Sequence, residues 1–185
     1  MSIFQLGGKA RCCRGGGTGG ERCPIPPPGK EKGRETMEIR LGTPQELDSW
    51  MALVDRVKDA FPGLETREAL AAHRKTGQAF MQRESAVCAI EDGVVVGTLL
   101  FSAEESALCF LAVDPSVRRR HVATGLVAYM LSRMDPERAI TVTTYREGEP
   151  AGTAARAFYK RLGFAEGKLT EEFGSPVQEF VLHRD

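Results

Sequence analysis

One short segment concentrates the side chains that could bind an anionic ligand. Three consecutive arginines occupy positions 118–120 and His121 follows them. An apolar run ends just before them at Asp114-Pro115, and apolar residues at helical spacing resume just after. The first backbone N–H groups of a helix have no internal acceptors, and the helix dipole adds partial positive charge there. A strand-to-helix junction with added guanidinium groups therefore predicts a phosphate-binding site.

Apolar periodicity predicts the elements that hold this junction in place. After Met37, a short alternating strand leads to Thr43-Pro44-Gln45-Glu46, a capping box with proline at the first helical position. A second helix is expected after Thr66, with a break or irregularity at Gly77. Asp92-Gly93 between two apolar runs predicts a hairpin turn.

The rest of the chain completes a pattern of alternating strands and helices. The near-continuous apolar run 107–113 predicts a buried strand at the centre of the sheet. A helix from Val122, a strand at 139–143 and a helix at 154–162 follow. Gly163-Phe164 and the segment from Val177 to His183 close the pattern as two more strands. The predicted order is β-α-α-β-β-β-α-β-α-β-β.

The junction and its surroundings resemble the GNAT superfamily of acetyl-CoA-dependent N-acetyltransferases. The family's central signature is Arg/Gln-x-x-Gly-x-Gly/Ala after a strand that ends in Val-x-Pro. Here it corresponds to Val113-Asp114-Pro115 and Arg118-Arg119-Arg120-His121-Val122-Ala123. The segment 154–164, with its tyrosine and its Leu-Gly-Phe ending, resembles a later helix of the family. The resemblance extends from Met37 to the C-terminus.

The resemblance implies an α/β (α+β) fold with a mixed, mostly antiparallel central sheet flanked by helices. It also implies acetyl-CoA as the acyl donor and direct attack by a primary amine, without a covalent enzyme intermediate. The pantetheine arm would run along the edge of the central strand where this strand splays from its neighbour, and backbone N–H groups near 111–113 would polarise the thioester carbonyl. The residues expected to bind acetyl-CoA are Leu111, Ala112, Val113, Arg118, Arg119, Arg120, His121, Val122, Ala123 and Thr124.

Tyr159 holds the position of the family's tyrosine, which the resemblance assigns as the acid that protonates the departing thiolate. A packing role on an amphipathic helix is the alternative for this residue. Glu104 or Glu105, in a turn between two strands, is the candidate general base, acting through water. Both glutamates also fit a role as solvated acids.

Two positions depart from the family pattern. His121 stands where most members have glycine, and we expect a helical φ there, which a residue with a side chain can adopt. Many members have an asparagine after the fifth strand, where this chain has Thr143-Thr144-Tyr145-Arg146. No side chain in this segment is therefore assigned to the pantetheine arm.

The charge distribution separates the first 36 residues from the remainder. Residues 1–36 hold seven of the 25 Lys and Arg and three of the 25 Asp and Glu, which leaves 18 basic and 22 acidic residues beyond them. An acidic body, without aromatic stacking positions beside the arginines, argues against a nucleic-acid-binding module. It suits a cationic amine acceptor.

Composition predicts a single folded domain and a location in the cytosol. Nine glycines and four prolines in residues 1–36 predict a disordered N-terminal extension, and residues 37–185 are expected to form one domain. The chain has no apolar run of about 18 residues, so we expect no membrane partner and place the protein in the cytosol. An odd number of cysteines without paired spacing predicts reduced thiols and no metal site; they are Cys12, Cys13, Cys23, Cys88 and Cys109.

The identity of the acceptor stays open at this point. A small amine, an amino acid, an antibiotic and a protein N-terminus all fit, and the expected assembly is a monomer or a homodimer. The segments expected to line the acceptor pocket, 61–84 and 145–152, carry no recognisable motif. A regulatory domain that binds acyl-CoA without catalysis is the alternative function on the same fold.

Overall fold

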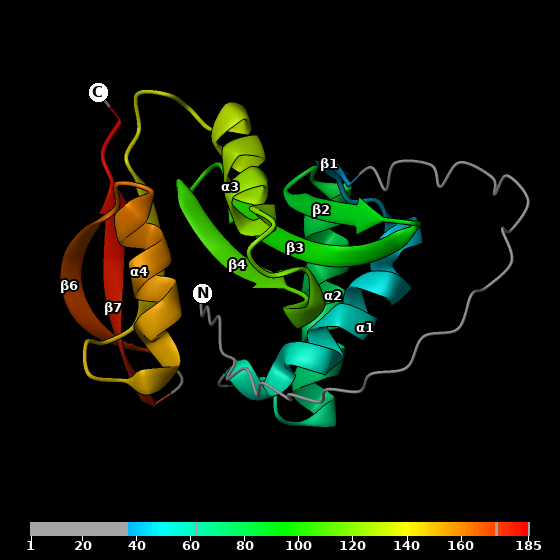
Figure 1. Ribbon diagram of the computed structural model, residues 1–185, viewed down its shortest axis with the longest axis horizontal. Coiled ribbons are helices and arrows are strands. Elements are labelled where there is room, and N and C mark those ends of the chain that lie inside the picture. Colours follow the sequence, from blue (N-terminus) through cyan, green and yellow to red (C-terminus); the bar gives the residue numbers. More distant parts are fainter. Residues whose placement is uncertain (1–36, 62, 173, 185) are drawn as a thin grey trace, which may run out of the picture.

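The computed structural model describes residues 37–61, 63–172 and 174–184, with helices and strands in the predicted order (Figure 1). The predicted N-terminal extension lies outside the described residues. The strands are β1 (Glu38–Leu41), β2 (Ala86–Glu91), β3 (Val94–Ser102), β4 (Ala107–Val113), β5 (Ile140–Tyr145), β6 (Ala165–Glu172) and β7 (Ser175–Leu182). The helices are α1 (Leu47–Val57), α2 (Arg67–Gln82), α3 (Val122–Arg133) and α4 (Thr153–Arg161). Short 3-10 helices are η1 (Pro44–Glu46), η2 (Lys58–Ala60), η3 (Pro115–Val117) and η4 (Pro150–Gly152).

The strands form one seven-stranded sheet in the order β1-β2-β3-β4-β5-β7-β6. Neighbouring strands are antiparallel except for β4 and β5, which are parallel. β4 is the middle strand, and its side chains are buried from Phe110 to Val113, as its apolar run predicts. The mixed, mostly antiparallel sheet confirms the expected fold class.

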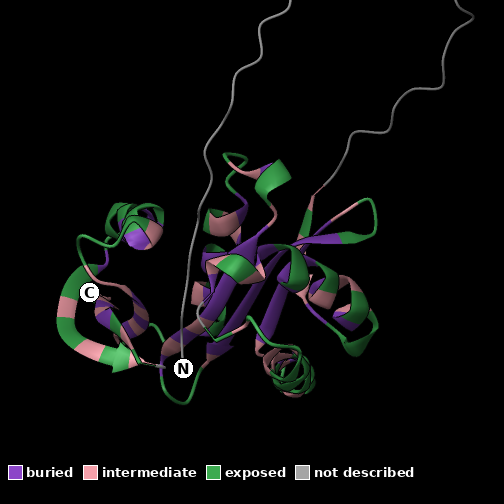
Figure 2. Cartoon of the chain, turned by 90° about the horizontal axis from the view of Figure 1, so that it is seen from below, coloured by how far each residue is buried: buried purple, intermediate pink, exposed green. Residues whose placement is uncertain are grey.

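Helices cover both faces of the sheet. α1 and α2 pack on one face around an apolar cluster that includes Trp50 and Phe61, here called the α1–α2 cluster. α3 and α4 pack on the other face, around a cluster that includes Leu126 and Phe158. Figure 2 shows buried residues concentrated along the strands and exposed residues on the outer sides of the helices. Each helix thus buries one apolar face, which is the arrangement that 3.6-residue periodicity predicts.

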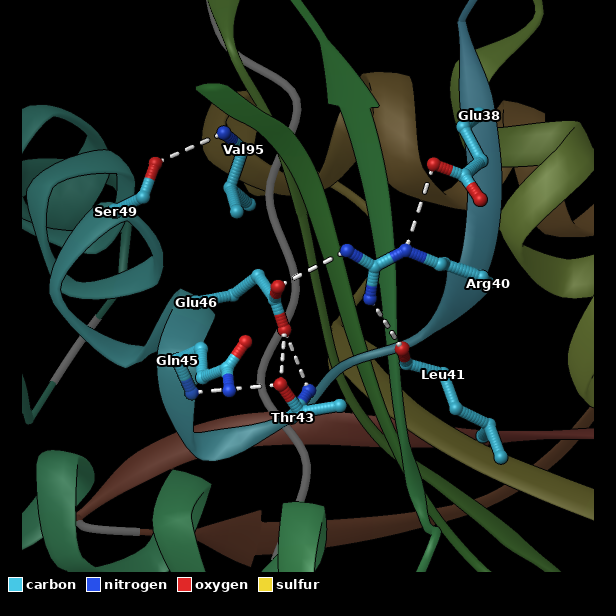
Figure 3. Close-up of polar contacts among 8 residues, drawn as sticks. All are labelled: Glu38, Arg40, Leu41, Thr43, Gln45, Glu46, Ser49 and Val95. Carbon is cyan, nitrogen blue, oxygen red and sulfur yellow. Dashed lines mark hydrogen bonds and ion pairs between the residues drawn. The ribbon is translucent and has the colours of Figure 1, made fainter. Parts of the chain in front are cut away.

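The start of α1 is stabilised by the predicted capping box (Figure 3). The Glu46 carboxylate accepts a hydrogen bond from the Thr43 backbone N–H at 2.7 Å and another from the Arg40 guanidinium at 2.9 Å. The bond from Arg40, with those from Thr43, lowers the pKa of Glu46 to about 2. The Val95 backbone N–H donates to the Ser49 hydroxyl at 2.9 Å. These contacts connect the N-terminal half of α1 to both β1 and β3.

Gly77 does not interrupt α2, which corrects the expected break. α2 continues from Arg67 to Gln82, and Gly77 is buried where α2 packs on α1. A Cβ added at Gly77 would lie 3.7 Å from the indole nitrogen of Trp50. Glycine weakens a helix by only about 1 kcal/mol relative to alanine, so packing against α1 is sufficient to keep the helix continuous.

The turn between β2 and β3 confirms the predicted hairpin. Asp92 and Gly93 have φ values of 51° and 78°, as the central residues of a primed turn require. This hairpin places Glu91, the last residue of β2, near the candidate phosphate-binding junction, where it forms an ion pair with Arg120.

Candidate active site

β4 and β5 diverge next to the junction. The two strands are paired in register only at Ala107 and Thr141, near their N-terminal ends, while β5 continues as a partner of β7 up to Tyr145. Figure 1 shows β4 parting from the unit formed by α4, β6 and β7. The C-terminal half of β4 therefore has a backbone edge without a ladder partner among the described strands. This is the splay that the resemblance implies.

A bulge turns the middle of β4. Leu100 pairs with Phe110 and Phe101 pairs with Leu108, which leaves Cys109 as the extra residue. Cys109 and Phe110 consequently both pack toward the α1–α2 cluster, although they are consecutive. The following side chains, at the predicted cofactor positions 111–113, are buried. Of these three residues, Ala112 and Val113 also line a cavity beside the junction.

The turn before α3 has two residues in the left-handed region, which corrects the expectation for His121. His121 has φ 59° and ψ 18°, and Arg119 has φ 64°. The helical φ expected for His121 is wrong, because this residue enters α3 in the conformation that favours glycine. The glycine of the family signature therefore corresponds to a real backbone requirement, which histidine meets here with some strain.

The first turn of α3 has no side-chain cap. His121 is the N-cap residue and makes no capping hydrogen bond with its side chain. The helical hydrogen-bond ladder begins with the Gly125 N–H, which donates to the His121 carbonyl at 2.9 Å. The N–H groups of Val122, Ala123 and Thr124 thus precede the first ladder bond. These predicted cofactor residues lie together at the positive end of the helix dipole.

The three arginines of the turn have different surroundings. Arg118 is partly buried, whereas Arg119 and Arg120 are exposed. The Arg120 guanidinium forms two hydrogen bonds to the carboxylate of Glu91, one of them at 2.9 Å. Arg120 therefore ties the turn to the end of β2.

Asp114 connects the turn before α3 to α1 through hydrogen bonds and an ion pair. Its carboxylate accepts hydrogen bonds from the Ser116 N–H at 2.9 Å and the Ser116 hydroxyl at 2.7 Å. It also pairs with the Arg56 guanidinium of α1 at 2.8 Å. Burial raises the pKa of Asp114, but the contacts with Ser116 and Arg56 outweigh that effect and leave the pKa lowered. The carboxylate is therefore ionised at neutral pH and fixes η3 against α1.

Gly97 of β3 allows α3 to pack closely on the sheet. A Cβ added at Gly97 would lie 2.9 Å from Cγ1 of Val122 and 3.0 Å from Cδ1 of Leu126. Real Cβ atoms essentially never come within 3.0 Å of another heavy atom, so a side chain here would force Val122 or its surroundings to shift. The close packing of the first turn of α3 on β3 thus involves a glycine that lies about 25 residues earlier in the sequence.

Tyr159 of α4 is completely enclosed. Its side chain is 0% exposed, and its ring centroid lies 5.5 Å from Phe158, 5.4 Å from Phe164 and 6.0 Å from Phe180. Burial raises the pKa of this phenol well above its ordinary value. The phenol therefore stays protonated at neutral pH, which an acid requires and which a packing residue also tolerates.

Glu104 and Glu105 lie at the wrong end of β4 for a general base. They are exposed in the turn between β3 and β4, next to the end where β4 pairs with β5. The Arg138 guanidinium donates to the backbone carbonyl of Glu104 at 3.0 Å. Since a strand rises about 3.3 Å per residue, these carboxylates lie roughly 20 Å along β4 from the junction. The structure does not bring them to the splay.

A cavity of about 130 Å³ adjoins the junction on the α1–α2 side, and its lining includes the predicted cofactor residues Ala112, Val113 and Arg118 and, from a segment expected to line the acceptor pocket, Phe61. The contribution of α1 and η2 was missed because their apolar spacing indicates only a packed helix. The cavity is lined by Arg56, Val57, Asp59, Ala60, Phe61, Ala112, Val113, Pro115 and Arg118.

The described residues offer no cluster of three metal-ligating side chains. Within the same residues, no helix is long and apolar enough to cross a membrane. Cys88 and Cys109 are free thiols, and burial raises the pKa of Cys88 to about 12. Cys88 is therefore a protonated core side chain.

Solved structures of several acetyltransferases share this architecture. An acetyltransferase of the GNAT family from Bacillus cereus superposes with a TM-score of 0.63 at 20% sequence identity, covering 80% of this chain and 98% of that one. An N-acetyltransferase from Staphylococcus aureus gives 0.63 at 15% identity, with 78% and 100% covered. The paia N-acetyltransferase from Thermoplasma acidophilum, in complex with coenzyme A, gives 0.58 at 13% identity, with 78% and 98% covered. At these identities the likeness shows a shared fold.

The sequence itself supports the same class of protein. The sequence model of the acetyltransferase (GNAT) family matches residues 50–164, from α1 to the segment after α4. A search of curated proteins finds no match. Because the family model spans more than half of the chain, this protein belongs to the GNAT acetyltransferase family.

Proposed function

We propose that this protein transfers an acetyl group from acetyl-CoA to a primary amine by direct attack. The observation that carries the proposal is the uncapped first turn of α3, placed where β4 ends and where its edge is free. Such a helix end binds phosphate through backbone N–H groups. A free strand edge beside it can hold an extended chain by backbone hydrogen bonds.

The residues present fit acetyl-CoA. The N–H groups of Val122, Ala123 and Thr124 would hold the pyrophosphate, with Arg118 and Arg119 supplying positive charge. Bound acetyl-CoA supplies an acetyl group activated as a thioester. Two observations support acetyl-CoA as the donor: the match to the acetyltransferase (GNAT) family and the similar fold of a structure in complex with coenzyme A. The edge of β4 at 111–113 would hold the pantetheine arm and point a backbone N–H at the thioester carbonyl.

Transfer forms a bond from the amine nitrogen to the acetyl carbon and breaks the bond from that carbon to sulfur. One proton moves overall from nitrogen to sulfur. We assign delivery of the proton on sulfur to the Tyr159 phenol, which burial keeps protonated, and the proton that the amine nitrogen loses restores the phenol by way of water. General acid catalysis of this kind contributes about 10²–10⁴-fold to a rate.

The alternative is a domain that binds acyl-CoA without catalysis, and the complete enclosure of Tyr159 is the observation in its favour. Two measurements on the full chain separate the functions. Calorimetry reports binding of acetyl-CoA, and release of free thiol with a panel of amines reports transfer. Binding with thiol release and an acetylated product supports the enzyme. Binding without release for any amine supports the regulator, and absence of binding refutes both.

A further inference from the structure

The cavity beside the junction combines apolar walls with a few charged side chains. Its charged lining residues are Arg56, Asp59 and Arg118. The other lining residues are apolar: Val57, Ala60, Phe61, Ala112, Val113 and Pro115. Mostly apolar walls with a few converging polar groups are typical of sites that bind small molecules.

The cavity reaches the part of β4 where the thioester is expected. Ala112 and Val113 belong both to its lining and to the edge of β4 assigned to the thioester carbonyl. Phe61 lines the cavity from the segment after η2, and its ring centroid lies 4.8 Å from that of Phe110 of β4. A molecule in this cavity would therefore contact the same stretch of β4 as the acetyl group, which is the place that an attacking amine must reach.

The Arg56 guanidinium has hydrogen-bond donors available for a ligand. Its Nη2 atom pairs with the Asp114 carboxylate at 2.8 Å, and the side chain is 47% exposed. Asp114 also accepts hydrogen bonds from the Ser116 N–H and hydroxyl, so its negative charge is shared among three donors. A guanidinium has five N–H donors in a planar fork, and this fork matches the two oxygens of a carboxylate. Arg56 can therefore bind an acidic group of a ligand while it stays paired with Asp114.

Asp59 supplies the opposite charge in the same lining. It lies in η2, three residues after Arg56, and it is exposed. Its neighbour Lys58 pairs with Asp55 at 2.9 Å instead, and within the described part of the chain the Asp59 carboxylate forms no ion pair. The cavity thus presents one carboxylate that can accept hydrogen bonds from an amino group.

The charges of the lining do not suit a simple cationic amine. Arg56 and Arg118 outnumber Asp59, so the lining is positive although residues 37–185 as a whole are acidic. In the proposed complex Arg118 faces the pyrophosphate of the donor, which leaves one guanidinium and one carboxylate for the acceptor. A molecule with one amino group and one carboxylate complements that pair, whereas an amine without an acidic group leaves the guanidinium uncompensated.

We propose that this cavity binds the acceptor, and that the acceptor is a small amino acid with its carboxylate on Arg56 and its amino group toward Asp59. The inference rests on the proposed acetyltransferase function. A volume of about 130 Å³ corresponds to about four water molecules at roughly 30 Å³ each, which suits a molecule of the size of alanine better than a peptide chain. The amino group loses a proton to water before it attacks, so the carboxylate is the charge that persists through the reaction.

The test compares L-alanine with L-alaninamide, in which a neutral amide replaces the carboxylate. Arg56→Gln should raise the KM for alanine about three- to tenfold, as expected for a charge pair at a half-exposed site, and should leave that for alaninamide within about twofold. Asp59→Asn should raise the KM for both molecules about two- to fivefold, because both carry the amino group. In each variant kcat should change less than KM.

Three further variants separate binding by Arg56 from a purely structural role. Asp114→Asn breaks the same ion pair but keeps the guanidinium, so it should not raise the KM for alanine. Arg56→Lys keeps the charge and should recover part of the lost affinity. Arg74→Gln on α2 is the matched control, because Arg74 is 45% exposed, pairs with Asp48 and lies outside the cavity. If Asp114→Asn weakens alanine as much as Arg56→Gln does, Arg56 only holds the turn and the inference is overturned.

A second readout does not depend on turnover. Calorimetry of alanine and alaninamide with the full chain saturated with CoA gives Kd values, and the Kd for alanine should rise in Arg56→Gln while that for alaninamide does not. If the wild type releases no thiol with any amine or amino acid, the proposed function fails, whereas binding of alanine that depends on Arg56 still upholds the site. No binding of alanine, or equal affinity for alanine and alaninamide, would overturn the inference. A loss of acetyl-CoA affinity in Arg56→Gln as large as the loss for alanine would also overturn it, because the cavity would then belong to the donor.

Discussion

Replacement of His121 by glycine should stabilise this fold. His121 enters α3 with φ 59° and ψ 18°, where a Cβ costs roughly 1–2 kcal/mol. Glycine removes that cost, but its greater freedom in the unfolded chain offsets about 0.5–1 kcal/mol. The expected net gain in the free energy of unfolding is about 0.5–1 kcal/mol. In a domain of this size that corresponds to roughly 1–4 °C in Tm.

Urea denaturation of wild type and variant, fitted with a common slope, measures this difference directly. His121→Ala is the first control, because alanine keeps the Cβ and should bring little of the gain. Gly93→Ala is the reverse control. Gly93 has φ 78°, and nothing lies within 4 Å of an added Cβ, so its expected loss of about 1 kcal/mol isolates the backbone cost.

The sign of the change in unfolding free energy tests whether His121 has a left-handed backbone conformation. If His121 were right-handed, glycine would destabilise α3 by about 0.5–1 kcal/mol. A loss of that size would refute the left-handed entry to α3. Affinity for acetyl-CoA should stay within about threefold, since the helix N–H groups keep their positions; a larger fall would assign the imidazole a contact with the donor.

Three further perturbations test the site and the fold. Tyr159→Phe should lower kcat by about 10²–10⁴-fold while acetyl-CoA affinity stays within about threefold; a rate within a factor of two of wild type would leave Tyr159 as a packing residue. Arg118→Glu with Arg119→Glu should weaken acetyl-CoA binding at least about a hundredfold by calorimetry, because each charge-assisted contact contributes roughly 1.5–3 kcal/mol. Arg120→Gln, which removes the pair with Glu91, is the control, and an unaltered Kd in the double variant would place the donor elsewhere. The pKa of Glu46 is about 2 in the fold, below its usual value of about 4.3, so the stability it contributes is present above pH 4.3 and is lost as the pH falls toward 2. Unfolding free energies of wild type and Glu46→Gln should differ by on the order of 2 kcal/mol at neutral pH and converge near pH 2; a constant difference would contradict the role of the pair with Arg40.

Features set by neighbouring residues were predictable from the sequence. The capping box at Thr43 and Glu46 and the turn at Asp92-Gly93 each depend on contacts within a few residues, and both are present. The order of strands and helices follows from the spacing of apolar side chains, and it was also correct. The strand-to-helix junction at 114–122 was found in the same way, because a continuous apolar run precedes it and apolar residues at helical spacing follow it.

Three local interpretations were wrong because they left out distant contacts. By local propensity Gly77 was predicted to break the helix, but it lies where α2 packs close to Trp50 of α1. His121 was predicted to have a helical φ, yet the turn from β4 into α3 places its backbone in the left-handed region. Glu104 reads as a possible base, although the parallel pairing of β4 and β5 puts the splay at the opposite end of the strand.

The sequence predicted where the candidate site lies along the chain, and the residues assigned to it stay a prediction, whereas the contacts that hold the site together could not be predicted. The run of arginines at 118–120 and the apolar strand before it indicate phosphate chemistry, because each signal lies within a few residues of the next. The ion pair of Arg120 with Glu91, the bracing of Asp114 by Arg56 and the crossing of Tyr145 to the α1–α2 cluster join segments about 30 to 85 residues apart. Such contacts exist only once these distant segments have come together in the folded chain. Periodicity specifies which residues are apolar in each element, but the tertiary fold alone decides which elements meet.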